Sequence, residues 1–220
     1  PNSMSDEHRA FLRSLARRRK LITAARFGLL VALTVLWEVA ARLGWINAFI
    51  VSSPSRAWQV AANLFNRGEL WLHLGMTVGE TAIGFTAGTL IGILVAVLLW
   101  WSDTLSEILD PYIVVLNAIP KVALGPIFIV WMGTNVNAII AMAIAVSVIV
   151  TIMMMYVGFK EVDPDRVKLL RTFGANRWQI LTKVVLPASV PVMIAALKVN
   201  VGLSMVGTIV GEFLVSRAGL

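Results

Sequence analysis

The 220-residue sequence contains no cysteine and only two histidines, His8 and His73. Without cysteine there is no disulfide framework, no thiolate metal site and no thiol nucleophile. The two histidines lie far apart, and neither has a second ligand residue at metal-binding spacing, so we expect no metal site. A phosphate-binding loop of the form G-x-x-x-x-G-K-[ST] and a catalytic constellation are also missing. The chain itself is therefore expected to be neither an ATPase nor another enzyme.

Charged residues are scarce as well, at 14% of the sequence, whereas 58% of the residues are hydrophobic and the mean hydropathy is +0.82. A soluble domain cannot bury that much apolar surface, because much of any folded chain faces water. We therefore expect an integral membrane protein. Its net charge of +7 is then explained by basic residues that gather on one side of the membrane, without a nucleic-acid site.

Five apolar runs are long enough to cross a bilayer, at about residues 21–41, 75–101, 111–132, 137–158 and 190–214. Residues 111–159 contain a single charge, Lys121, but one straight helix of that length would be about 73 Å long, more than twice the ~30 Å hydrocarbon core. The chain must therefore turn back, and the polar break at 133–137 is where we expect it to do so. Residues 102–110 are predicted to form a loop, and 52–73 a short interfacial helix that starts near Pro54. The fold class is thus an all-α, polytopic transmembrane helical bundle.

Basic residues predict the orientation of these spans. Of the nineteen Lys and Arg residues, seven lie at or before Arg26 and six lie between the fourth and fifth spans. The positive-inside rule places both segments in the cytoplasm, and the even number of spans between them agrees. Residues 1–20 are then a basic cytoplasmic segment, in which residues 1–3 precede Met4 and are expected to be a remnant of expression. Residues 21–220 form one transmembrane domain.

The stretch 159–189 is too polar to span the membrane and has the pattern of two short helices on the cytoplasmic face. Asp163 and Pro164 mark the start of the first helix, as an N-cap and a first-turn proline. Gly174 ends this helix, where a positive φ is expected. The second helix is predicted to end at Leu186 and Pro187. On this pattern alone, an amphipathic loop lying on lipid headgroups is equally possible.

Gly174, the nine residues after it, and Val184 to Pro187 resemble the signature loop of ABC-importer permeases, whose pattern is Glu-Ala-Ala, three residues, Gly, nine residues, Ile, any residue, Leu, Pro. Here Lys168, Leu169 and Leu170 replace Glu-Ala-Ala. Four further stretches are similar to the nitrate, sulfonate and taurine branch of these permeases: SPSRAWQ at 53–59, HLGMTVGETAIGFTAGTLIGI at 73–93, IPKVALGPIFIVWMG at 119–133 and VDPDRVKLLRTFGANRWQI at 162–180.

This resemblance implies a type I ABC-importer permease fold in the bacterial inner membrane, with a sixth span beyond Leu220 and a cytoplasmic N-terminus. It also implies a permease subunit with several partners. A cytoplasmic ATPase dimer would carry ATP and Mg²⁺, and a second permease copy, expected to be identical, would complete the membrane part. An external solute-binding protein would deliver the solute, and lipid would surround the helices. The solute would be a small anion such as nitrate, a sulfonate or taurine. The resemblance assigns ATPase docking to the coupling loop 159–189, through Asp163, Lys168, Arg171, Thr172, Gly174, Ala175, Arg177, Trp178 and Pro187.

The translocation path is expected along the third span, which is interrupted at Pro111, Pro120, Gly125 and Pro126. These interruptions free backbone groups that are tolerated only inside protein or beside a cavity, and Pro120 is the candidate path residue. Lys121 and Lys198 lie within membrane depth and could attract an anion. The alternative, which we favour, is that they snorkel or pair with Glu80 or Glu212. A glycine stripe at 75, 79, 84, 88 and 92 is suited to close helix packing.

Two other functions fit the composition. A secondary transporter or channel would usually place a coupling carboxylate or histidine deep in a span, and it has no need of a long cytoplasmic docking loop. A membrane anchor for a cytoplasmic partner would explain that loop but not the proline-rich third span.

Overall fold

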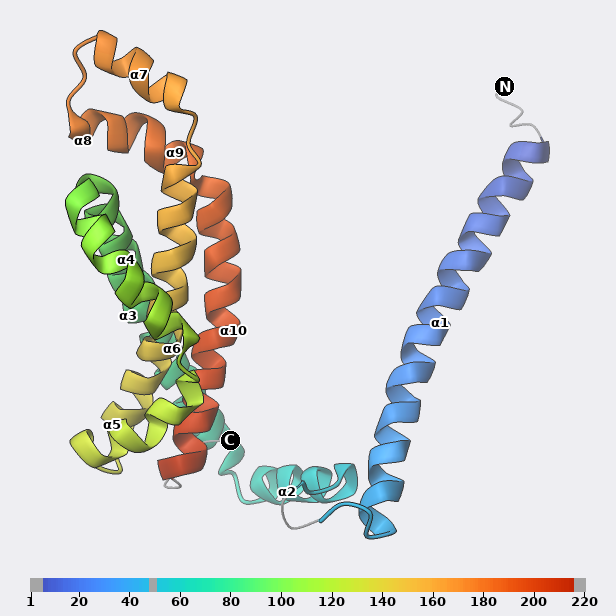
Figure 1. The fold of residues 1–220 in the computed structure, drawn as a ribbon. Coiled ribbons are helices and arrows are strands. Elements are labelled where there is room, and N and C mark those ends of the chain that lie inside the picture. Colours follow the sequence, from blue (N-terminus) through green and yellow to red (C-terminus); the bar gives the residue numbers. More distant parts are fainter. Residues whose placement is uncertain (1–5, 48–50, 216–220) are drawn as a thin grey trace. The chain divides into compact units, whose positions relative to one another are not determined.

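The computed structural model describes residues 6–47 and 51–215, and every regular element in these two ranges is helical (Figure 1). The chain divides into two compact units, of which the first ends at Leu70 and the second begins at Trp71. In the described ranges, four helices are long and apolar enough to cross a membrane, and one bent pair of helices could form a fifth span. The predicted all-α bundle of membrane helices is confirmed.

The first unit consists of α1 (Asp6–Arg42) and α2 (Pro54–Asn66). The apolar part of α1 is Arg17–Arg42, which contains the predicted first span, and residues 6–16 belong to the same helix. The α2 helix confirms the predicted short helix but is shorter than expected. Ser53 is its N-cap and accepts a hydrogen bond at Oγ from the Arg56 N–H (3.3 Å), and Pro54 occupies the first turn.

Glu38 joins α1 to α2. Its Oε1 accepts hydrogen bonds from Arg42 Nε (2.7 Å) and Ser55 Oγ (2.9 Å), and its Oε2 accepts one from the backbone N–H of Ser55 (3.1 Å). A carboxylate at a helix N-terminus satisfies free N–H groups and interacts favourably with the helix dipole.

Glu38→Ala should release α2 from α1, because the substitution removes every hydrogen bond that the carboxylate accepts. We expect a local cost of about 1–2 kcal/mol. The measurement is hydrogen exchange, which should accelerate at the first amides of α2 by roughly tenfold. Glu69→Ala is the control, since this exposed acid follows α2 without a side-chain hydrogen bond to it among the described residues. Equal exchange in the wild type and the Glu38 variant would contradict the assignment.

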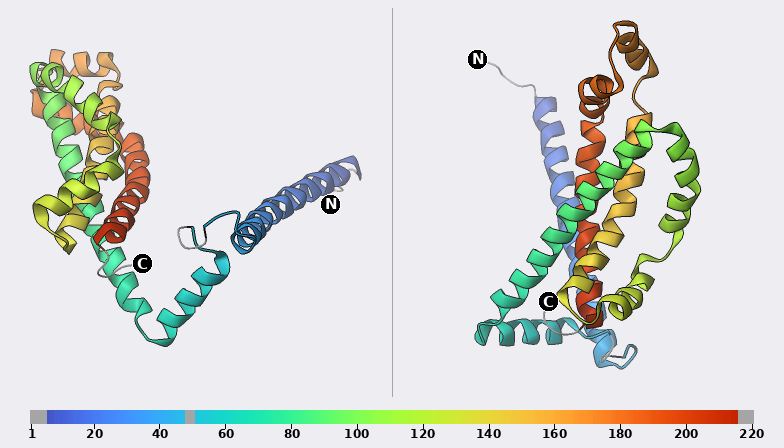
Figure 2. Two further views of the ribbon diagram at one scale, coloured as in Figure 1. Left: turned by 60° about the horizontal axis from the view of Figure 1, so that its bottom comes forward. Right: turned by 90° about the vertical axis from the view of Figure 1, so that its left-hand side faces the viewer.

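The second unit is built on α3 (Leu70–Trp101), α6 (Val136–Lys160) and α10 (Val190–Val215). The helices α6 and α10 lie side by side, and α3 crosses them at an angle (Figures 1 and 2). Three of the predicted stripe glycines face α6: a Cβ at Gly84 would lie 2.5 Å from Ala143 Cβ, and Gly88 and Gly92 are as tightly packed. The packing role is confirmed for these three. Gly75 and Gly79 have open space instead.

The third predicted span differs from expectation in two ways. Its helix α4 (Asp103–Ala118) already begins inside the predicted 102–110 loop, so the loop prediction is wrong. Ser102 Oγ accepts a hydrogen bond from the Leu105 N–H (3.2 Å) and caps the helix directly after α3.

The second difference concerns the four predicted interruptions of this span, of which Pro120 alone marks a sharp bend. A bend of 92° separates α4 from η1 (Lys121–Leu124) and α5 (Gly125–Met132). Pro120 causes the break, because it has no N–H to donate and it holds Ile119 in an extended conformation (φ −65°, ψ 130°). Pro111, by contrast, lies inside α4 without ending it.

Beyond α6 the chain forms α7 (Pro164–Thr172), α8 (Arg177–Ile180), a π-helical turn η2 (Leu181–Val185) and α9 (Leu186–Ala188). The predicted helix–glycine–helix pattern is confirmed, and the second helical segment ends at Ala188, one residue past the predicted end at Leu186 and Pro187. The Leu186 N–H bonds to the Leu181 carbonyl, which makes the turn before Pro187 a π-helical one.

Candidate functional site

The second half of the 159–189 loop is anchored in the core of the second unit. Ile180, Leu181 and Val185 are at most 1% exposed. They form one apolar cluster with residues of all three long helices, namely Ala96, Met155, Phe159 and Ala196. Because interiors are close-packed, a displacement of α8 and η2 must move these helices as well.

The beginning of α8 is fastened to the end of α3. Arg177 Nη1 donates a hydrogen bond to the carbonyl of Trp101, the last residue of α3. The indole rings of Trp101 and Trp178 lie next to each other, with centroids 6.4 Å apart. Asn176 and Gln179 close a capping box at the same place, with bonds of 2.8 and 2.9 Å. These contacts therefore hold the first turn of α8 against the end of α3.

The turn between α7 and α8 depends on the conformation of Gly174, whose φ is +79°. Its N–H bonds to the Arg171 carbonyl (2.9 Å), and the Ala175 N–H bonds to the Leu170 carbonyl (3.0 Å). A Cβ at this position would meet no atom within 4 Å. Glycine is thus favoured by its backbone conformation and not by lack of space.

Large apolar side chains face outward on this loop. Phe173 is 80% exposed, Trp178 61% and Leu169 55%. We call these three residues the apolar tip. Their placement on a segment too polar to span a membrane is typical of a surface that contacts another protein.

The remaining predicted docking residues lie on the same loop. Asp163 caps α7 by accepting from the Asp165 N–H (2.9 Å), and Lys168 Nζ lies 3.4 Å from Asp165 Oδ1. Thr172 Oγ1 donates to the Leu169 carbonyl (2.6 Å), whereas Ala175 is half-buried against the apolar cluster. Two further residues, Arg171 and Pro187, are exposed.

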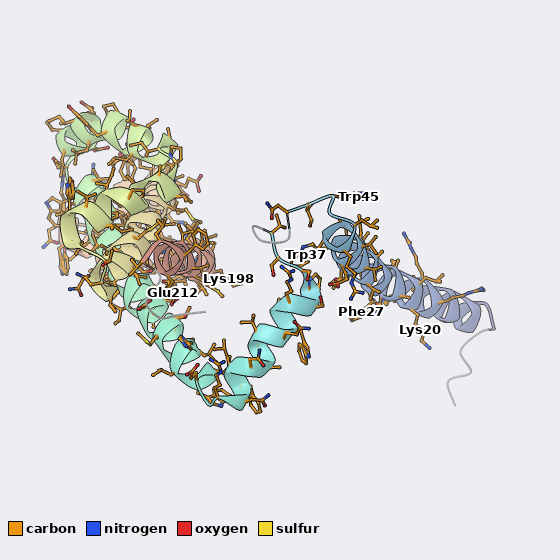
Figure 3. All side chains as sticks on the ribbon, turned by 90° about the horizontal axis from the view of Figure 1, so that it is seen from below. Lys20, Phe27, Trp37, Trp45, Lys198 and Glu212 are labelled. Atoms are coloured by element: carbon orange, nitrogen blue, oxygen red, sulfur yellow. The ribbon has the colours of Figure 1, made fainter. Side chains whose placement is uncertain are left out.

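The residues predicted for the translocation path do not converge. Lys121 Nζ donates to the backbone carbonyl (3.1 Å) and to Oδ1 (3.3 Å) of Asn117, so it caps the end of α4 at the Pro120 bend. Lys198 is exposed on α10, and Figure 3 labels it together with Glu212. In residues 6–47 and 51–215, neither lysine forms an ion pair with Glu80 or Glu212.

A row of buried polar residues follows one face of α10 and was not predicted from the sequence: Asn200, Ser204, Thr208 and Glu212. Their spacing of four within an apolar run is the signal that could have revealed them, since it places all four on one helix face. This arrangement is typical of membrane helices, whose polar side chains bond to each other across helices.

Asn200 Nδ2 in this row donates to Thr89 Oγ1 of α3 (3.0 Å) and to Thr151 Oγ1 of α6. At the other end of the row, Thr77 Oγ1 of α3 donates to Glu212 Oε1 (2.6 Å), and buried Glu80 lies beside Glu212. These bonds link α3, α6 and α10 into one body.

Comparison with known proteins gives a family match over the second unit. The sequence model for the binding-protein-dependent transport system inner membrane component matches residues 88–220. A probable ABC transporter permease protein of Haemophilus influenzae is 31% identical over 189 residues, which cover 86% of this chain and 76% of the relative. The formylaminopyrimidine transport permease protein of Halalkalibacterium halodurans is 28% identical over 86% of this chain and 74% of its own. A putative aliphatic sulfonates transport permease protein of Bacillus subtilis is 28% identical, with 88% and 71% covered.

Proposed function

Because the chain belongs to the family of inner membrane components of binding-protein-dependent transport systems, we propose that its 159–189 loop receives the motion of an ATPase and passes it to the membrane helices. The protein is a multi-pass inner membrane permease subunit of an ABC importer, a system that includes an ATPase subunit and a substrate-binding protein. The role of the loop is our inference from its geometry.

The observation that carries this proposal is the two-sided character of the loop. On one side, Ile180, Leu181 and Val185 are buried among α3, α6 and α10; on the other, the apolar tip is exposed. A segment that is fixed inside and apolar outside can transmit a push from a bound partner to the helices behind it. An amphipathic loop that only lay on lipid headgroups would not require the buried anchor formed by Ile180, Leu181 and Val185.

In the proposed cycle, ATP and Mg²⁺ bind to the ATPase pair, and closure of this pair moves two permease copies between inward-facing and outward-facing states. We propose an identical second copy, a cytoplasmic N-terminus and bilayer lipid around the apolar helices. The long face of α1 supports lipid contact, since side chains such as Phe27 (68%) and Leu30 (63%) are exposed along it.

For the solute we propose a small anion, of which an aliphatic sulfonate is one candidate. Lys198 supports this assignment, because it is exposed and lies well inside α10, a helix long and apolar enough to cross the membrane. A charged side chain at that depth is costly against lipid but not beside water or a passing anion. The sulfonate name of one relative agrees with an anionic solute, although another relative is named for a pyrimidine.

Phe173→Asp should prevent ATPase docking, because it places a charge on the apolar tip. We expect the affinity for the ATPase subunit to fall by roughly tenfold or more, since burial of a phenyl side chain contributes about 1.5–3 kcal/mol. Co-purification and vanadate-sensitive uptake by vesicles that contain the binding protein would measure the loss.

Phe173→Leu should retain docking. Phe65→Asp is the matched control, because it removes another exposed phenyl group (61%), on α2, and adds the same charge. ATPase binding by Phe173→Asp at wild-type strength would contradict the proposal.

A further inference from the structure

A cavity of about 410 Å³ lies under the 159–189 loop, at the ends of α3 and α6. Four basic side chains line it, Lys160, Lys168, Arg171 and Arg177, whereas Asp103 is its one acidic lining residue in the described part of the chain. The chain elements that meet here are α3, α4, α6, α7 and α8. We call this space the basic cavity.

The positive charge of the basic cavity is largely unpaired. Lys168 has a loose contact with Asp165 (3.4 Å), but Lys160, Arg171 and Arg177 take part in no ion pair within the described ranges. Arg177 uses one guanidinium nitrogen for the Trp101 carbonyl and has further N–H groups to donate. Several cations facing one small space repel each other unless an anion binds between them.

The lysine at the base of the cavity is positioned by its neighbours. Lys160 Nζ lies 4.8 Å from the centre of the Tyr156 ring, a cation–π distance. The Tyr156 hydroxyl is in turn hydrogen-bonded to Ser106 Oγ of α4. This arrangement places the ammonium group at the point where α6 ends, before any ligand is present.

The cavity also has an apolar side that continues along a membrane helix. Trp100 and Phe159 belong to its lining. On the adjoining face of α3, Leu94 (60%), Leu98 (48%) and Trp101 (38%) are exposed at helical spacing. Indoles beside basic residues at the end of a spanning helix mark the interface where lipid headgroups lie.

We propose that the basic cavity binds a phosphate-bearing anion. Arginine and lysine donors match phosphate oxygens, and the cavity has room for a headgroup of a few heavy atoms. The exposed stripe on α3 favours a phospholipid as the source, with its headgroup among Lys160, Arg171 and Arg177 and its acyl chains along α3. A bound anion would tie α7 to α8 and to the end of α6, and would thereby stiffen the loop.

The test is titration of the purified full chain with phosphatidylglycerol, and separately with phosphatidylcholine, followed by native mass spectrometry. The variant Lys160→Gln/Arg171→Gln should weaken phosphatidylglycerol binding about tenfold, because it removes two charge-assisted contacts. The control Arg166→Gln/Lys183→Gln removes the same charge from the same loop outside the cavity lining and should bind like wild type. All four side chains are exposed, so both variants should fold.

A competition arm identifies the source of the phosphate. This arm applies once the Lys160→Gln/Arg171→Gln variant has shown weakened binding and the control variant has not. If excess inorganic phosphate then fails to displace phosphatidylglycerol, the lipid headgroup is the ligand; if it displaces the lipid from wild type, a free phosphate compound is the ligand. Equal binding of phosphatidylglycerol by wild type and both variants, with no effect of inorganic phosphate, would overturn the proposal. Equal weakening by both variants would also overturn the proposal, because binding would then depend on the net positive charge of the loop and not on the residues that line the basic cavity.

Discussion

Gly174→Val is expected to abolish ATP-driven uptake and the stimulation of ATPase activity while the protein still inserts into the membrane. Gly174 has a φ of +79°, a region in which a β-branched side chain is strained by about 1–2 kcal/mol or more. No neighbouring atom lies within 4 Å of the new Cβ, so the strain is relieved only by a change of the turn itself. Such a change re-aims α7 together with Leu169 and Phe173 of the apolar tip, while Ile180 and Val185 stay in the core.

Two variants isolate the cause in this experiment. Gly174→Asn should keep most of the activity, because asparagine adopts the left-handed region more readily than valine does. Gly68→Val carries a similar strain, since Gly68 has a φ of +72° and open space around it, but it lies between α2 and α3. Its coupling of ATP hydrolysis to uptake should be unchanged. Normal uptake by Gly174→Val, in vesicles that contain it at wild-type levels, would exclude the role of this turn.

Gly207→Val is expected to prevent α10 from packing and so to destabilise the whole second unit. A Cβ at Gly207 would lie 2.7 Å from Ala143 Cα and 3.2 Å from both Ala143 N and Met142 O. All three are backbone atoms of α6, which cannot rotate away as a flexible side chain can. Overpacking of an interior typically costs 1–3 kcal/mol, and a clash with backbone lies at the upper end of that range or above it.

Gly202→Val provides the matched control for this prediction. Gly202 is in the same helix, five residues earlier, but a Cβ there meets nothing within 4 Å. Its effect on stability should stay within about 0.5 kcal/mol. Thermal unfolding in detergent and the yield of monodisperse protein measure both variants. If both glycine variants lowered stability equally, close packing at Gly207 would not be the cause, because Gly202 has open space and valine forms helices more readily than glycine.

Local sequence signals predicted a large part of this structure. The apolar runs located the long helices, because length and hydropathy alone decide whether a segment can cross a bilayer. Asp163, Pro164 and Gly174 predicted the limits of α7 correctly, since caps and positive φ depend on neighbours in sequence. The predicted glycine stripe was confirmed where Gly84, Gly88 and Gly92 contact α6.

Features that depend on contacts distant in sequence were not predicted. The partners of Asn200 on α3 and α6 lie 111 and 49 residues away, and no local pattern names them. The start of α4 was missed because its acidic first turns resemble a loop, although Ser102 and Asp103 are also typical of a helix start. Four residues were predicted to interrupt the third span, whereas the 92° bend lies at Pro120 alone. The sequence does not show which of several prolines and glycines will bend a helix.

The outward direction of the apolar tip is set by a single extra residue. A π-helical turn contains one residue more than the α-helical turn it replaces. Deleting one residue from Leu181–Val185 would let this segment close as a regular α-helix and rotate everything before it by about 100° relative to α10. Trp178 and Phe173 would then face a different direction, even if neither side chain were itself replaced. Related permeases with a residue gained or lost at this point are therefore expected to present a different side to their ATPase.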